Sequence, residues 1–181
     1  TDTEASNKAQ ESFESAINMA KKASDGKIKI LGSIAPLEDC YSPGLFPGEK
    51  IAKKEFEEIG GVFQDSSIDC FILETMNSIV ETRTCLAAIE KFNIPIWVSF
   101  NLLNPTQIGS GEPLEKAIKM IGKYAVDCLL LNCNPLERTV EALKIIKTFW
   151  SKKWGIYPNI GKGEPSPDGV ISDYYNRILF F

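Results

Sequence analysis

The chain has 181 residues, of which 44% are hydrophobic and 24% are charged, a balance typical of a folded globular domain. Lysine and arginine total 20 against 24 acidic residues, so the formal net charge is -4, and no basic segment indicates a nucleic-acid partner. Histidine is absent, which excludes Ser-His, Cys-His and histidine-metal chemistry. Carboxylates, hydroxyls, backbone amides and 5 cysteines remain as candidate functional groups.

The cysteines are spread along the chain and form neither a dense framework nor a C-x-x-C metal pair. We interpret them as reduced thiols of a cytoplasmic protein. No long apolar run indicates a membrane span, and the acidic residues 1–4 differ from the basic start of a signal peptide. We therefore expect no membrane association.

The hydrophobic pattern alternates amphipathic helices with short, almost continuously apolar runs. In chain order we predict a helix ending at residues 25–26, a strand over 27–34, a Pro- and Gly-rich loop over 35–48, a helix over 51–64, a strand over 68–73, a helix over 79–92, a strand over 95–100, a helix opening at Pro113, a strand over 126–131, a helix ending at Trp150, a strand over 154–157 and the start of a helix over 172–181. The apolar stripe of the second helix continues through Gly60 and Gly61, so we expect that helix to include both glycines.

Two helix starts carry capping signals. Ser78 and Glu81 have the spacing of a capping box before the helix that begins at residue 79. Asn134 is expected to cap the helix that ends at Trp150, with Pro135 in its first turn.

Continuous apolar strands that alternate with helices indicate parallel pairing with both faces of the sheet covered. A doubly wound sheet and a closed barrel both fit this pattern. In a (β/α)₈ TIM barrel, functional groups come from many strand ends, whereas an open sheet concentrates its site at one switch point. Polar side chains end five successive strands, which favours the barrel: Ser33, Glu74, Ser99, Asn132 with Cys133, and Asn159.

Cys133 is the most informative cysteine, because it lies between a strand end and a helix start, where backbone amides favour an anionic sulfur. A buried free thiol that only packs is the competing interpretation. Cys70, Cys85 and Cys128 lie within expected elements and are interpreted as packing residues, while Cys40 lies in the long loop.

Glu74 ends a buried strand, where a carboxylate is suited to hold the ammonium group of a small substrate. It could equally be a solvated or capping acid. Tyr157 and Asn159 offer a phenol and an amide at the same rim, and simple turn chemistry is the alternative for both.

Several runs, taken together and in order, resemble the homocysteine S-methyltransferase family of zinc-dependent barrels, which includes betaine-homocysteine methyltransferase and the homocysteine domain of methionine synthase. The runs are TDTEASN at residues 1–7, GSIAPL at 32–37, FILETM at 71–76, WVSF at 97–100, LNC at 131–133 and GIYPN at 155–159. The first run is similar to one that the family places at the end of strand two.

The resemblance implies a methyltransferase that moves a methyl group from an onium-type or related donor to the zinc-activated thiolate of homocysteine, forming methionine. It implies that Cys133 is the first of three zinc thiolates and that Glu74 holds the amino group of homocysteine. Asn132 and Asn159 would shape the site around metal and substrate. Further candidates on the same rim are Ser33, Tyr157 and Thr3.

The sequence departs from the family pattern in two places. The family's other two zinc cysteines form an adjacent pair after strand eight, and this chain has no Cys-Cys pair and no cysteine after Cys133. Strand one, with its Asp-Gly run, has no counterpart either. We therefore expect residues 1–181 to be a partial homocysteine-binding barrel domain, from the end of strand 2 to about helix 7.

The first hypothesis is an enzyme that acts on homocysteine and a small methyl donor, with zinc (Zn²⁺) bound, provided that the complete protein carries the missing cysteine pair. The alternative is a non-catalytic or split-barrel partner subunit without a complete zinc site. A barrel of the same ancestry that acts on another thiol is a third hypothesis. The sequence indicates no particular donor, and it is compatible with an oligomer.

Overall fold

The computed structural model describes residues 2–162, with side chains from residue 8 onward. The helices are α1 (Asp2–Ser24), the 3₁₀ helix η1 (Pro43–Leu45), α2 (Glu49–Asp65), α3 (Ile79–Ile89), the 3₁₀ helix η2 (Glu90–Phe92), α4 (Leu114–Ile121) and α5 (Leu136–Phe149). The strands are β1 (Leu31–Ile34), β2 (Cys70–Met76), β3 (Ile96–Phe100), β4 (Leu102–Asn104), β5 (Gln107–Ile108), β6 (Val126–Asn132) and β7 (Lys153–Tyr157).

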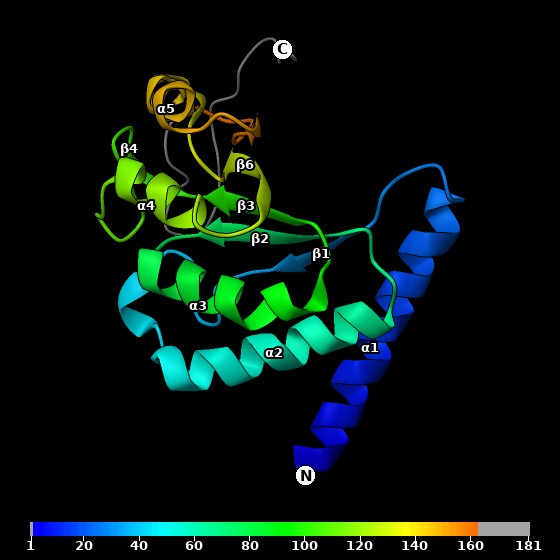
Figure 1. Cartoon of the computed structure of the whole chain (residues 1–181). Coiled ribbons are helices and arrows are strands. Elements are labelled where there is room, and N and C mark those ends of the chain that lie inside the picture. The colour runs from blue at the N-terminus through cyan, green and yellow to red at the C-terminus, as the bar shows by residue number, and fades with distance from the viewer. Residues whose placement is uncertain (1, 163–181) are drawn as a thin grey trace.

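Five strands form one parallel sheet with the order β1-β2-β3-β6-β7. The short strands β4 and β5 form a separate antiparallel hairpin after β3. Helices α2 and α3 pack side by side along the sheet, while α1 extends away from them (Figure 1). The predicted alternation of helices and parallel strands is therefore confirmed within the described residues.

The two faces of the sheet bury different side chains, because successive residues of a strand point to opposite sides. Phe71 of β2 and Leu129 of β6 belong to the main core, together with the buried side chains of the helices. The opposite face carries a separate apolar cluster made of Leu31, Ile72, Trp97, Cys128 and Leu130. The helices thus cover one face, and the alternate strand residues define the other.

A chain of aromatic rings joins four elements of the main core. The ring centroids of Phe13 in α1 and Phe63 in α2 lie 5.1 Å apart, and Phe63 meets Phe71 of β2 at 6.1 Å. Phe71 in turn lies 6.3 Å from Phe92 of η2. Edge-on aromatic pairs of this kind contribute about 0.5–1.5 kcal/mol each beyond the area they bury, so these rings fix α1 and α2 against the sheet.

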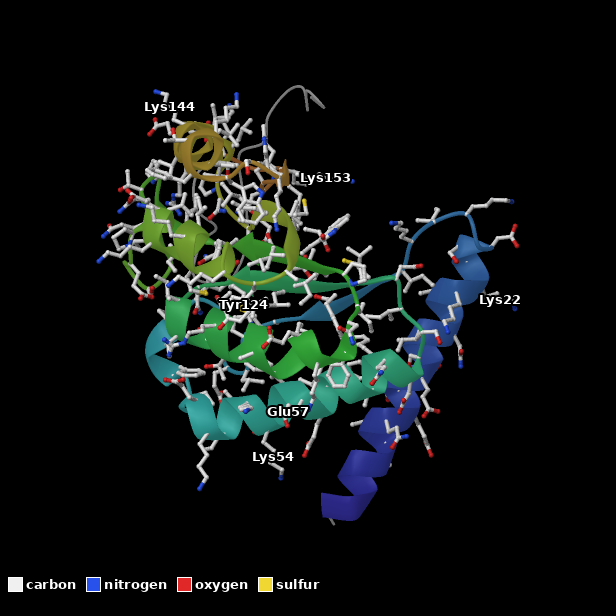
Figure 2. The ribbon with its side chains drawn as sticks, viewed as in Figure 1. Lys22, Lys54, Glu57, Tyr124, Lys144 and Lys153 are labelled. Carbon is white, nitrogen blue, oxygen red and sulfur yellow. The ribbon has the colours of Figure 1, made fainter. Side chains whose placement is uncertain are left out.

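Ion pairs at the surface contribute much less. Arg83 of α3 and Glu49 of α2 approach to 3.1 Å, but both side chains are about half exposed and their charges are screened. Lys54 of α2 and Lys144 of α5 also lie at the outer surface of their helices (Figure 2). Stability therefore comes mainly from the apolar core.

The predicted capping box is half formed. The Ser78 hydroxyl accepts a hydrogen bond from the Glu81 backbone N–H at 3.4 Å, as expected for an N-cap. The Glu81 carboxylate instead accepts from the Leu37 N–H at 2.9 Å, so it ties the long loop after β1 to α3. Burial raises the pKa of Glu81, while the hydrogen bond from Leu37 lowers it.

The prediction that Asn134 caps α5 is wrong. Pro135 occupies the N-cap position, and the Asn134 side chain accepts from the Leu102 N–H at 2.6 Å and donates to the Phe100 carbonyl at 3.4 Å. The amide therefore holds the β4–β5 hairpin, which the sequence pattern did not predict, against the start of α5. Pro113 likewise occupies the N-cap of α4 rather than its first turn.

The ends of the chain also differ from expectation. Residues 2–7, which were expected at a strand end, belong to the first turns of α1. The helix predicted over 172–181 lies outside the described residues. Within the described part of the chain, no helix combines the length and apolar character needed to cross a membrane.

The neighbouring glycines of α2 provide a matched test of this packing. A Cβ on Gly60 would lie 2.4 Å from the Phe92 ring, whereas a Cβ on Gly61 would have no neighbour within 4 Å. Both alanine variants gain helix propensity of about 0.5–1 kcal/mol. We expect Gly61→Ala to be stabilised and Gly60→Ala to be destabilised by about 1–3 kcal/mol through overpacking. Urea denaturation of both variants checks this, and equal stability of the two would contradict the packing described.

Candidate active site

The polar residues predicted at strand ends gather on the inner face of the sheet, opposite the helices. Ser33 stands beside Ile72 and Ser99 beside Leu130 in the register of the sheet, and both partners belong to the inner apolar cluster. Glu74 and Asn132 each lie two residues further along those strands and therefore point to the same side. Tyr157 pairs with Asn132 and joins them. The strands carry these side chains to one rim, at the arrowheads in Figure 1.

Glu74 is held by two hydroxyl groups from different strands. The Ser33 hydroxyl donates to its Oε2 at 2.7 Å, and the Tyr157 hydroxyl donates to its Oε1 at 3.0 Å. Burial raises the pKa of Tyr157, and the Glu74 charge raises it further, while a hydrogen bond with Ser99 partly offsets both effects. The phenol therefore keeps its proton and acts as a donor to Glu74.

The bond between Tyr157 and Glu74 also reports the curvature of the sheet. Strand β7 is separated from β2 by β3 and β6. At about 4.8 Å per strand, a flat sheet would separate the two backbones by roughly 14 Å. The two long side chains span part of this gap to meet at 3.0 Å. The short Asn132 side chain of β6 also reaches the Thr75 N–H of β2 across β3, so the sheet bends toward its inner face as a barrel wall does.

Asn132 lies beside this carboxylate and is 1% exposed. Its Oδ1 accepts from the Ser99 hydroxyl at 2.5 Å and from the Thr75 backbone N–H at 3.2 Å. Its Nδ2 donates to Thr75 Oγ1 at 2.7 Å and to Cys133 Sγ at 3.1 Å. One buried amide thus connects the ends of β2, β3 and β6.

Two residues at this rim adopt left-handed backbone conformations that non-glycine residues rarely use. Thr75 has φ 59° and Cys133 has φ 53°. A β-branched residue such as threonine is an outlier at positive φ. The side chains of the two residues approach to 3.8 Å between Oγ1 and Sγ. Such strain persists where neighbouring bonds enforce it, and it is concentrated at functional sites.

Cys133 is half-buried and borders a cavity of about 220 Å³. The cavity is also lined by Tyr41, Asn101, Leu102, Leu103, Gly109 and Arg138. The Asn77 amide donates to the Cys40 carbonyl at 2.9 Å and so fixes the loop after β1 at the mouth. Cys133 is therefore reachable from the cavity on one side and fixed by Asn132 on the other.

The remaining cysteines fall into two groups. Cys70, Cys85 and Cys128 are buried, in agreement with their interpretation as packing residues. Burial raises the pKa of Cys70 to about 12 and also raises the pKa values of Cys85 and Cys128. Cys40 is half-buried in the loop, and burial, Asp39 and the nearby Cys133 raise its pKa.

Two predicted site residues have less defined roles. Asn159 is half-buried on the turn after β7, where its backbone N–H donates to the Asn134 carbonyl at 2.9 Å. Thr3 belongs to α1, but its side chain lies outside the described part of the molecule. Thr75 was not among the predicted site residues, and no local signal marks a threonine for positive φ. Ser99 was recognised only as a polar strand end.

The described residues do not complete a zinc site. Among the residues that the structure describes, no group of three or more Cys, Asp or Glu side chains could hold a metal ion. The sequence has no histidine and no cysteine after Cys133. Structural and catalytic zinc sites need at least three protein ligands, so Cys133 could supply only part of one.

Comparison with known proteins gives consistent matches. The family model described as homocysteine S-methyltransferase matches residues 1–176. Homocysteine S-methyltransferase 1 of Arabidopsis thaliana is 26% identical over 107 residues, which cover 56% of this chain and 32% of that protein. Homocysteine S-methyltransferase 3 of Zea mays is 28% identical over 104 residues, covering 56% and 31%. The chain thus spans about a third of the length of these curated relatives.

Solved structures show the same likeness. The metallated form of the homocysteine methyltransferase MmuM from Escherichia coli has a TM-score of 0.79 and 20% identity, with 84% of this chain and 59% of that chain covered. The apo form has a TM-score of 0.77, covering 86% and 62%. At this identity the likeness shows the fold, and the predicted TIM-barrel class of α/β protein is confirmed for the described residues.

The family model covers nearly the whole sequence, and the fold of the described residues agrees with it. The chain belongs to the homocysteine S-methyltransferase family.

Proposed function

We propose that the complete protein transfers a methyl group to the sulfur of homocysteine and forms methionine. The observation that carries the proposal is the carboxylate of Glu74, held at the barrel rim by Ser33 and Tyr157 close to the Asn132–Cys133 group. Family membership supports methyl transfer to homocysteine in general. The hydrogen bonds of Glu74 and Cys133 support the individual roles that we propose.

Glu74 is proposed to bind the ammonium group of homocysteine. Each of its oxygens accepts one described hydrogen bond, and a carboxylate oxygen can accept two. The remaining acceptor positions suit the N–H groups of an ammonium ion. Charge-assisted hydrogen bonds of this kind are about twice as strong as neutral ones. Ser33 and Tyr157 would keep the carboxylate oriented while the substrate binds.

Cys133 is proposed to contribute one thiolate to a zinc ion. The described residues supply no group of three ligands, so the other ligands would have to come from elsewhere in the complete protein. Asn159 would line the same rim beside Asn134. Asn132 contacts Cys133 directly through its Nδ2.

The proposed reaction is a direct transfer of a methyl group from a cationic, onium-type donor. The sulfur of homocysteine loses its proton to solvent and forms the new bond to the methyl carbon. The bond from that carbon to the donor heteroatom breaks, and its electron pair stays on the heteroatom, which becomes neutral. No histidine is needed as a general base, in agreement with a sequence that has none.

Substitution of Glu74 tests the substrate anchor. Loss of a charge-assisted hydrogen bond costs about 1.5–3 kcal/mol, so Glu74→Gln should raise KM for homocysteine by roughly 10- to 150-fold in steady-state assays of the complete protein. Tyr157→Phe, which keeps the carboxylate and removes one neutral donor, should raise KM by only about 2- to 10-fold. An unchanged KM in Glu74→Gln would show that the ammonium group binds elsewhere.

Substitution of Cys133 tests the metal assignment. Cys133→Ser should lower the zinc affinity of the complete protein at least about tenfold, because a serine hydroxyl is a poor zinc ligand. Cys40→Ser is the matched control, since it removes the other half-buried thiol and should leave the metal content unchanged. Unchanged zinc in Cys133→Ser would contradict the assignment. A complete wild-type protein that binds no zinc would favour the alternative of a partner subunit.

A further inference from the structure

The side chain of Asn132 uses all of its hydrogen-bonding groups inside the protein. Its oxygen accepts two hydrogen bonds and its nitrogen donates two, which is the full capacity of a carboxamide nitrogen. The residue is 1% exposed, so a substrate could reach it only by displacing one of these partners. A buried and fully paired amide of this kind fixes its neighbours rather than binding a ligand.

The orientation of the amide is determined by its partners. The backbone N–H of Thr75 can only donate, so Oδ1 must face it, at 3.2 Å. The Ser99 hydroxyl donates to the same oxygen at 2.5 Å and reinforces that choice. The NH₂ group is thereby directed toward Thr75 Oγ1 and Cys133 Sγ, at 2.7 Å and 3.1 Å.

The amide also stabilises an otherwise strained backbone. Thr75 and Cys133 both have positive φ, a backbone conformation that is unfavourable for residues with a side chain. Asn132 bonds the side chains of both residues and the backbone N–H of Thr75. Its loss would allow the two strand ends to relax toward ordinary conformations.

We propose that Ser99 and Asn132 form a positioning pair, in which the Ser99 hydroxyl orients the Asn132 amide so that its N–H holds the sulfur of Cys133. Ser99 is 0% exposed, and its hydroxyl donates to Asn132 Oδ1 at 2.5 Å. The use of this sulfur in catalysis rests on the proposed function, whereas its positioning does not.

Two isosteric variants test the pair. Ser99→Thr keeps the hydroxyl and Ser99→Val replaces it with a methyl group, so the steric change is the same in both. The rate of alkylation of Cys133 by iodoacetamide is measured in the complete, chelator-treated protein by mass spectrometry, and Cys40 serves as the internal control. We expect Ser99→Val to slow alkylation of Cys133 about five- to tenfold, because the Asn132 amide that holds its sulfur beside the cavity is less firmly oriented, and to leave Cys40 unchanged. Ser99→Thr should remain within about twofold of wild type.

Equal alkylation rates of Cys133 in both variants would overturn the proposal. Parallel changes in the alkylation rates of Cys133 and Cys40 would also overturn it, because they would indicate that the fold around both cysteines has loosened. If Ser99→Val does not fold, Ser99→Ala carries the same expectation. Kinetics add a second readout: kcat should fall in Ser99→Val while KM for homocysteine stays unchanged, since Glu74 is intact. The alkylation result requires no substrate, so it remains valid if methyl transfer to homocysteine is not found.

Discussion

The hydrogen bond between Tyr157 and Glu74 joins two strands that have two others between them, and the bend of the sheet toward its inner face brings these side chains together. Parallel pairing, the twist of the strands and helices packed on one face together favour this curvature. The same bend brings the end of β6 within reach of β2, where Asn132 bonds Thr75. A flat sheet with the same sequence would leave these polar side chains as separate, solvated strand ends.

Around this curved rim the protein separates two tasks. Glu74 keeps acceptor capacity for a ligand and is steadied by hydroxyl groups. Asn132 has no such capacity left and holds the left-handed Thr75 and Cys133 in place. The strained Cys133 borders a cavity of about 220 Å³, whose lining does not include Glu74.

Much of this architecture could be predicted from the sequence, because it depends on local patterns. Continuous apolar runs indicated the parallel strands, and polar residues at their ends indicated a shared rim that includes Glu74 and Asn132. Features that depend on distant partners could not be predicted. Asn134 and Glu81 had the spacing of helix caps, yet both bond a backbone N–H some 30 to 45 residues away. The positive φ of Thr75 likewise arises from tertiary contacts.

The proposed zinc site is incomplete in the described residues. The family resemblance implies that Cys133 is a zinc thiolate, but the described residues provide no group of three or more ligands. The chain spans about a third of its curated relatives, so zinc chemistry has to be examined on the complete protein. The proposed binding of homocysteine by Glu74 involves residues that are present in this sequence.

The most direct measurement compares methylation of homocysteine with that of 4-mercaptobutanoate, which has the same thiol and carboxylate but lacks the amino group. With the complete protein and an onium donor, the account predicts methionine formation from homocysteine and at least about tenfold slower methylation of the analogue at low concentration, because Glu74 loses its charged partner. Equal rates with both thiols, or no methionine from homocysteine, would contradict it.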